Sequence, residues 1–394
     1  MKNPVKFFSE RIRFDRNEFL GAFGDIGTSL PLLVAVIAAS GIDGAKAFIM
    51  FGLIQMVTAI IYGVPMSIQP LKAVAMLVIA QKLSGNIIFG AGLSIGIVML
   101  FLTLTGVLEK IGKILPATVI RGIQFGLGIQ LATTALKVYI PSEGIPGYVL
   151  AGTCAIIGFV LLGNRKYPPA LLLIITGIIY AVISGKSGAA LLKPETVSGL
   201  LYIPKTADII AGFLLLAIPQ IPLSLGNSIY ATEKLANEYF PEKKITSRKI
   251  GMTYSIMNII NPFLGGLPVC HGSGGMAGHY AFGARTGGSV FIYGLIIFAA
   301  GIMGGDGMSG FIAMFPKPVL GAILFFEAIA LMSLARNYAQ EKNSFSVILL
   351  TGTIAAAVPY GYVTGMICGT LLHNFYMSQN TIQQGVKTEK AAAK

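Results

Sequence analysis

The chain has 394 residues, 54% of them hydrophobic and 11% charged, with a mean hydropathy of +0.76. A soluble globule could not cover so much apolar surface with so few polar side chains, so the composition excludes a soluble fold and indicates an integral membrane protein. The net charge of +13 could suggest nucleic acid, but the basic residues fall in short connections between apolar stretches, so no nucleic-acid partner is expected.

The predicted membrane segments follow a charged N-terminal stretch. Residues 1–17 carry charges where a signal peptide would need its apolar core, so this stretch is expected to stay as a cytosolic segment. From Glu18 to Met377, apolar stretches of roughly 17–25 residues recur, which is the length that crosses a bilayer. We count about fourteen such segments, of which the third and the tenth are irregular. The sequence therefore predicts an all-α polytopic membrane protein.

The chain resembles itself at an offset of roughly 200 residues. Segments of the first half correspond to segments of the second: 62–75 to 265–278, 114–132 to 314–332 and, more loosely, 24–36 to 219–232. Seven spans per half is an odd number, so the second half must insert upside down, which is the inverted-repeat plan of secondary transporters. The predicted parts are a first repeat (18–185), an extracytoplasmic linker (186–205), a second repeat (206–378) and a cytosolic tail (379–394).

The basic residues gather on one side of this topology. The side that holds both termini takes most of the Lys and Arg residues, and the positive-inside rule places it in the cytoplasm. We expect a multi-pass protein of the plasma membrane. The opposite side keeps only Lys46, Lys82, Lys137, Lys186, Lys193, Lys205 and Lys317.

The third and tenth segments are each predicted to be a short strand followed by a half-helix. Residues 64–69 can be extended, and Pro70 then opens a helix of about a dozen residues, too short to cross alone. The second copy covers 266–285. Irregular backbone at this depth needs protein or a polar cavity around it. Two half-helix N-termini are therefore expected to meet near the midplane, each offering unpaired N–H donors to an anion.

Polar side chains in the two crossings are candidates for contacting that anion. Ser67 and Gln69 lie in the first crossing, and Cys270, His271 and Ser273 lie in the second. A tetrahedral oxyanion only accepts hydrogen bonds, so it requires donors of this kind. The alternative is that these side chains merely cap the broken helices.

Glycines leave the start of the second half-helix without side chains. At Gly272, Gly274 and Gly275 an anion can approach the N–H groups closely, as glycine permits in phosphate loops. The alternative is that glycine lets this helix pack tightly against a neighbour.

Charged residues in other spans extend the candidate site. Asp25, at the entry to the first span, is costly to bury unless paired or protonated, and is a candidate for substrate binding and proton coupling, or else an exposed helix cap. Glu327 is a second proton-coupling candidate, or a partner for Arg121. Lys72, in the first turn of a half-helix, could attract the anion or neutralise a carboxylate. Polar residues that could contact the ligand or simply join helices are Thr28, Ser29, Gln220, Ser224 and Asn227.

Nothing in the sequence indicates a metal site, a cofactor or an enzyme. Cys154, Cys270 and Cys368 are scattered without a CxxC pair, and His271 and His279 are too far apart to ligate a metal from one helix face. The sequence also lacks the motifs of the common hydrolases and metalloproteases.

Four segments carry a resemblance to a known family: FGDIGTSLPLL, VPMSIQPLKAVA, IPLSLGNSIYAT and LPVCHGSGGMAGHYAFGARTGGS. They resemble the signature segments of the molybdate transporters of plants and microbes, distant relatives of the sulfate permeases. The resemblance implies fourteen segments in two inverted sevens, a core domain that moves against a gate domain, and an oxyanion held between the third and tenth segments. Sulfate permeases open the second half-helix with an S-R-S pattern, whereas GSGGMAG supplies no arginine, which shifts weight to backbone N–H groups and to His271 or Lys72.

The sequence is therefore interpreted as a secondary active importer of a tetrahedral oxyanion, molybdate first and sulfate second, driven by protons. The alternatives are a nucleobase-type permease, which shares the two crossed half-helices, and an anion channel. A homodimer is compatible with the sequence.

Overall fold

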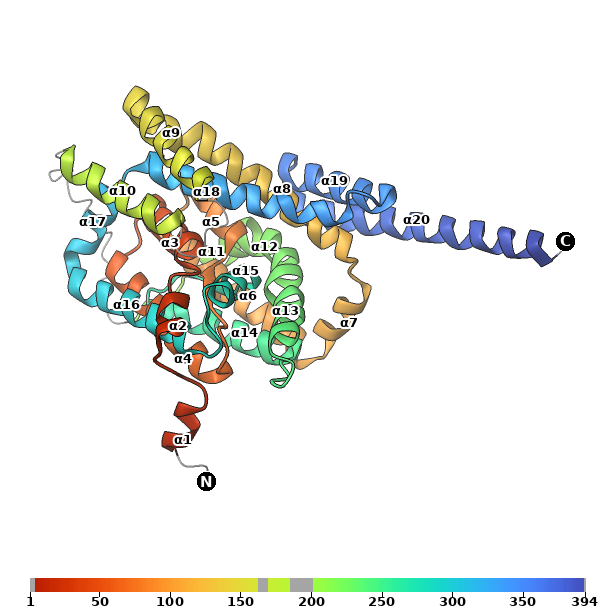
Figure 1. Cartoon of the computed structure of the whole chain (residues 1–394), viewed down its shortest axis with the longest axis horizontal. Helices are drawn as coiled ribbons and strands as arrows, with labels where there is room; N and C mark the ends of the chain where they lie inside the picture. Colours follow the sequence, from red (N-terminus) through yellow and green to blue (C-terminus); the bar gives the residue numbers. More distant parts are fainter. Residues whose placement is uncertain (1–3, 162–168, 185–200, 393–394) are drawn as a thin grey trace.

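The computed structural model describes residues 4–161, 169–184 and 201–392, and nearly all regular structure in these ranges is helical (Figure 1). The elements up to residue 184 are α1 (Pro4–Ser9), α2 (Arg16–Gly21), α3 (Ile26–Ser40), α4 (Gly44–Tyr62), β1 (Ile68–Pro70), α5 (Lys72–Gln81), α6 (Gly85–Leu104), α7 (Val107–Ile114), α8 (Ala117–Thr134), η1 (Ala135–Tyr139), η2 (Ile140–Glu143), α9 (Gly144–Val160) and α10 (Pro169–Ile183). Those from residue 201 are α11 (Thr206–Gly212), η3 (Phe213–Ala217), α12 (Ile218–Leu223), η4 (Ser224–Ala231), α13 (Thr232–Tyr239), α14 (Ser247–Phe263), β2 (Val269–His271), α15 (Ser273–Ala281), α16 (Gly288–Gly304), η5 (Gly305–Gly307), α17 (Met308–Met314), α18 (Lys317–Ser333), η6 (Leu334–Tyr338), α19 (Lys342–Ala357) and α20 (Gly361–Ala392).

Several of these helices are long and apolar enough to cross a membrane. Among the described residues, five helical stretches meet that criterion: Gly44–Tyr62, Gly85–Leu104, Ala117–Val160, Thr206–Tyr239 and Lys317–Tyr338. Large apolar side chains such as Ile145, Val160 and Ile183 face outward with at least three quarters of their surface exposed, as expected for a surface that contacts lipid. The prediction of a mostly helical, multi-pass membrane protein is confirmed.

The predicted linker and the predicted cytosolic tail are described only in part. The predicted linker 186–205 lies outside them from 186 to 200. The predicted cytosolic tail begins inside α20, which continues as one helix to Ala392 and extends away from the other helices in Figure 1.

The helices form two groups. Figure 1 shows α8, α9, α18, α19 and α20 running along one another across one side of the molecule, and α19 packs on both α8 and α20. In the other group α16 packs on α4, and α14 packs on α6. Glycine allows these contacts to be close: a Cβ atom on Gly52 of α4 would lie 2.5 Å from the carbonyl oxygen of Gly294 in α16, and one on Gly126 of α8 would lie 2.5 Å from that of Gly352 in α19.

Two short strands interrupt the helical pattern where the sequence predicts it. Gly63 and Gly265 take the left-handed conformation, with φ of 65° and 74°, and each ends the helix before a strand. Prolines follow at 65 and 268, and they keep the next residues from continuing a helix. The strands β1 and β2 then pair antiparallel, with Gln69 opposite Cys270. The half-helices α5 and α15 have 10 and 9 residues, slightly shorter than predicted.

A side-chain amide satisfies the outer edge of each strand. The Gln55 amide donates to the carbonyl oxygen of Ile68 at 2.9 Å and accepts its N–H at 3.0 Å. The Asn258 amide does the same for Val269, at 2.7 Å and 2.9 Å. Both amides are fully buried. Because a two-stranded ribbon leaves one edge of each strand unpaired, these amides replace the missing neighbouring strands.

Candidate functional site

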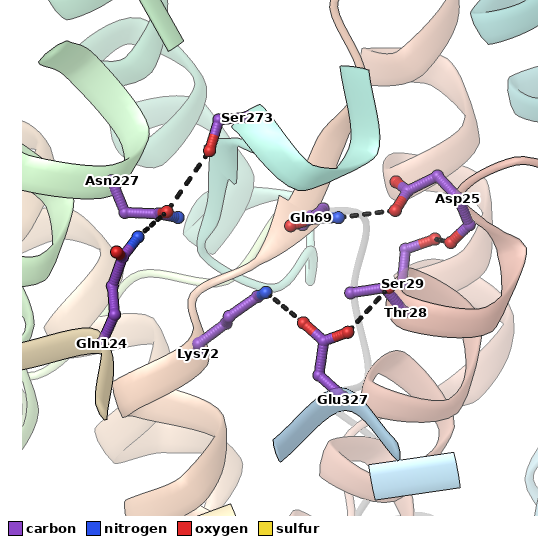
Figure 2. Close-up of polar contacts among 9 residues, drawn as sticks. All are labelled: Asp25, Thr28, Ser29, Gln69, Lys72, Gln124, Asn227, Ser273 and Glu327. Atoms are coloured by element: carbon purple, nitrogen blue, oxygen red, sulfur yellow. Dashed lines mark hydrogen bonds and ion pairs between the residues drawn. The ribbon is translucent and has the colours of Figure 1, made fainter. Parts of the chain in front are cut away.

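The strand pair places the starts of α5 and α15 inside the protein, where polar side chains of α3, α8, η4 and α18 surround them (Figure 2). Most polar residues predicted for the site lie here. The contacts fall into three clusters: Asp25 with Gln69, Ser273 with Asn227, and Lys72 with Glu327.

Asp25 lies at the start of α3 but does not cap it. Its side chain makes no capping hydrogen bond and is 1% exposed, so the alternative of an exposed cap is wrong. Instead the Gln69 amide donates to the Asp25 carboxylate at 2.5 Å. The Ser29 hydroxyl donates to the Asp25 main-chain carbonyl at 2.8 Å and lies 2.7 Å from the Tyr293 hydroxyl. Ser29 thus bonds within its own helix and to α16.

The start of α5 is already occupied by a side chain of the protein. The Gln220 amide oxygen accepts the N–H groups of Ala73 and Val74 at 2.9 and 3.2 Å, and its nitrogen donates to Ser224 at 3.0 Å. The prediction that both half-helices offer unpaired N–H donors is therefore wrong for α5. Gln220, held by Ser224, therefore closes the N-terminal end of α5.

The start of α15 is open by comparison. Gly272 provides no side-chain cap, and no described residue accepts the N–H groups of Ser273, Gly274 or Gly275. A Cβ atom on Gly274 would meet nothing within 4 Å. The open end of α15 therefore has room and donors for an anion.

The other two glycines of this turn have packing roles. A Cβ atom on Gly272 would lie 2.4 Å from the Gln69 amide oxygen, and one on Gly275 would lie 2.1 Å from the Ser67 hydroxyl and 2.7 Å from the second Asp25 carboxylate oxygen. The prediction that all three glycines leave space for a ligand is wrong for Gly272 and Gly275, whose missing side chains make room for residues of the protein.

A chain of amides continues from Ser273 to α8. The Ser273 hydroxyl donates to Asn227 at 3.3 Å, and the Gln124 amide donates to the same Asn227 oxygen at 2.7 Å. Arg121 donates to Gln124 at 2.9 Å, so the alternative of an Arg121 pair with Glu327 is wrong. Sequence reasoning missed Gln124, whose available signal was an amide side chain one turn after Arg121 in a mostly apolar helix.

Lys72 and Glu327 form an ion pair between α5 and α18. The other Glu327 oxygen accepts the Thr28 hydroxyl at 3.1 Å. These three side chains line a cavity together with apolar residues of α3, α8 and α18 that include Leu32, Leu131 and Ile323. In this structure Lys72 therefore neutralises a carboxylate, which is one of the two roles expected from the sequence.

The remaining candidates are Ser67, Cys270 and His271, which are buried in and beside the two strands. Ser67 packs beside Asp25, and Cys270 is buried in β2. The His271 imidazole lies 2.7 Å from the Thr253 hydroxyl and packs edge-on against Tyr62. Within the described residues, no three His, Cys, Asp or Glu side chains converge as metal ligands would.

Comparison with known families gives a consistent result. A family model described as molybdate transporter of the MFS superfamily matches residues 17–131 and 212–331. Molybdate transporter 1 of Arabidopsis thaliana is 31% identical over 88% of this chain and 86% of its own length. Molybdate transporter 2 of the same plant is 30% identical over 95% of this chain and 88% of its own length.

Solved structures of anion transporters share the fold. The match to the transmembrane domain of the cyanobacterial bicarbonate transporter BicA spans 92% of this chain and 99% of that domain, with a TM-score of 0.63 and 16% identity. The match to murine Solute Carrier 26 family member A9, an anion transporter in the inward-facing state, spans 96% of this chain and 73% of that chain, with a TM-score of 0.68 and 11% identity.

Proposed function

The chain belongs to the molybdate transporter family, and we propose that it is a secondary active permease that imports a tetrahedral oxyanion, molybdate first, by alternating access. The observation that carries this proposal is the open start of α15, whose unclaimed N–H groups face a buried cluster of amides and hydroxyls. An oxyanion accepts hydrogen bonds and is stabilised by the positive end of a helix, so it suits this place.

The substrate site of this proposal has four parts. The N–H groups of Ser273 and Gly274 form its floor, and Asn227 and Ser273 supply side-chain donors. Asp25 and Gln69 border it on the side of α3, and Lys72 supplies the positive charge. Thr28 and Gln220 hold Glu327 and the start of α5 in place. Ser67, Gly272, Cys270 and His271 act through the strand pair that positions both half-helices.

We infer that the fold is the inverted repeat expected from the sequence, with α3 to α6 and α8 to α10 as the first seven segments. The second seven would be α12 with η4, α14, α15, α16, α18, α19 and α20. Matching contacts support this division: α4 packs on α16 as α6 packs on α14, and Gln55 and Asn258 hold equivalent strands. The group that contains the strands would be the core, and the group of α8, α18 and α19 the gate.

Charge balance supports coupling to protons. With both carboxylates ionised, Asp25 and Glu327 carry two negative charges against the single positive charge of Lys72. A doubly charged oxyanion would then enter a site whose net charge is already negative, which is unfavourable at low dielectric. Protonation of Asp25 or Glu327 removes that repulsion, so we infer that each anion is accompanied by at least one proton.

Uptake into liposomes tests the function. Purified protein should take up radiolabelled molybdate saturably, faster with an inward proton gradient, and tungstate should compete more strongly than sulfate. Uptake blocked by uracil and indifferent to molybdate would replace the proposal with a nucleobase permease. Single-channel currents without saturable flux would replace it with an anion channel. Sulfate as the preferred competitor would make sulfate the substrate, since the two anions share charge and shape.

The membrane orientation is a separate proposal. The distribution of Lys and Arg supports a plasma-membrane protein with both termini in the cytoplasm. A reporter fused after Lys394 should therefore be active only inside the cell, and an extracellular reporter would reject this orientation. A homodimer stays a prediction, which native mass spectrometry of the purified protein would test.

A further inference from the structure

The ion pair of Lys72 and Glu327 joins the two groups of helices. Lys72 is the first residue of α5, in the group that contains the strands, and Glu327 lies in α18 of the other group. The second ion pair among the described residues, Lys46 with Asp43, links neighbours three positions apart at 4.0 Å. Within those residues, Lys72 with Glu327 is therefore the ion pair that crosses between the groups.

Lys72 occupies an unfavourable place within its own helix. The start of a helix carries partial positive charge, so a cation is stabilised at the other end. The Lys72 side chain is also only 7% exposed, and burial of an ammonium group is costly unless negative oxygen atoms surround it. Nothing in α5 supplies such oxygens, because its first turn contains only Ala, Val and Lys residues. Lys72 depends on an anion from outside α5.

Glu327 supplies that anion from a position open to the cavity. Its side chain is 20% exposed, compared with 7% for Lys72. Figure 2 shows the Lys72 ammonium between the Asn227 and Ser273 contact on one side and Glu327 with Thr28 on the other. An oxyanion near the start of α15 would offer Lys72 the same kind of negative oxygen atoms as Glu327.

We propose that Lys72 selects a doubly charged oxyanion and that Glu327 is its internal counter-ion, which the arriving anion displaces. This inference rests on the proposed function. When the anion takes the Lys72 ammonium, Glu327 stays with α18 and Thr28, and the tie between α5 and α18 is broken. Occupancy of the site is thereby transmitted to the contact between the two groups of helices, which must move for alternating access.

Three variants of the full-length purified protein test this exchange by calorimetric titration with sodium molybdate. Glu327→Gln removes the competing anion and should tighten binding about tenfold. Lys72→Met should weaken binding about a hundredfold. The double variant should stay well below the wild type in affinity, because without the Lys72 ammonium the loss of Glu327 frees no positive partner for the ligand. Glu341→Gln, an exposed residue at the start of α19, is the matched carboxylate control and should bind as the wild type does.

A purely structural ion pair predicts a different ranking of the three variants in affinity. In that case each single variant leaves a buried charge unpaired, so both should lose melting temperature and affinity, and the double variant should recover both. That result would overturn the exchange. If Lys72→Met fails to fold, Glu327→Gln decides alone, since unchanged or weaker binding rejects displacement.

Perchlorate tests the selection for charge. It is tetrahedral like molybdate but carries one negative charge, so the wild type should prefer molybdate and Lys72→Met should lose most of that preference. An unchanged preference would reject Lys72 as the selecting residue. A wild-type protein that binds neither molybdate, tungstate nor sulfate would instead reject the proposed function itself.

Discussion

Replacing Asn258 by leucine should destabilise the protein by removing the support of β2. The Asn258 amide makes both of its strand contacts to one residue, accepting the Val269 N–H at 2.9 Å and donating to its carbonyl oxygen at 2.7 Å. Leucine has the same branched skeleton with somewhat larger end groups, so the substitution leaves no cavity behind. Two buried main-chain groups would lose their partners, at about 1–3 kcal/mol each, which gives a loss of about 2–6 kcal/mol in the free energy of unfolding.

The measurement is unfolding in mixed detergent micelles at increasing SDS, followed by circular dichroism. Ser255→Ala is the matched control, because Ser255 is also fully buried in α14 but donates only to the Gly251 carbonyl of its own helix. It should cost about 1 kcal/mol or less. Gln55→Leu should behave like Asn258→Leu, since Gln55 makes the same two contacts to Ile68. If Asn258→Leu matches the Ser255→Ala control, the amides do not replace the missing strands.

Three further outcomes are expected. Gly274→Ala should leave the melting temperature unchanged, because the added Cβ meets open space, but it should weaken molybdate binding at the start of α15. Ser273→Ala should lose a hydrogen-bond donor to a charged ligand, worth about 1–3 kcal/mol of binding free energy. Normal affinity in both variants would remove α15 from the site. Asp25→Asn should flatten the rise of molybdate uptake with falling external pH, and a slope equal to that of the wild type would reject Asp25 as a proton carrier. Glu18→Gln should lower the free energy of unfolding by about 1–3 kcal/mol, because this buried carboxylate accepts three main-chain N–H groups near the start of α16, and a melting temperature equal to that of the wild type would contradict this role.

Local chemistry made the interruption of the helices predictable. Glycine that can adopt positive φ, followed two or three residues later by proline, ends a helix in any surroundings, and both features occur before each strand. The same short-range signals located the half-helices, because Pro70 and the glycines after His271 stop a continuous span. The antiparallel pairing of the strands follows from where the two halves meet in space.

Partner choice was not predictable, because it depends on how each helix is rotated about its axis. From the sequence, Lys72 could attract the anion or neutralise a carboxylate, and Glu327 could pair with Arg121 or carry a proton. Lys72 and Glu327 are 255 positions apart in the chain and meet where two helices pack together. Gln220 reaches the start of α5 over 147 positions. No local pattern encodes such distances, whereas the presence of a polar side chain in an apolar span is visible in the sequence.

The two half-helix starts differ in a way that bears on where the anion binds. In the correspondence of 24–36 with 219–232, Asp25 takes the place of Gln220. Gln220 gives a neutral oxygen to two N–H groups of α5, while a carboxylate oxygen of Asp25 lies against the first turn of α15. A neutral amide has no protonation step that would release the α5 donors, so that end stays closed. A carboxylate repels an oxyanion when ionised and not when protonated. If the repeat is inverted and the chain carries an oxyanion as proposed, this single difference would confine the anion to α15 and would make its entry there depend on a proton.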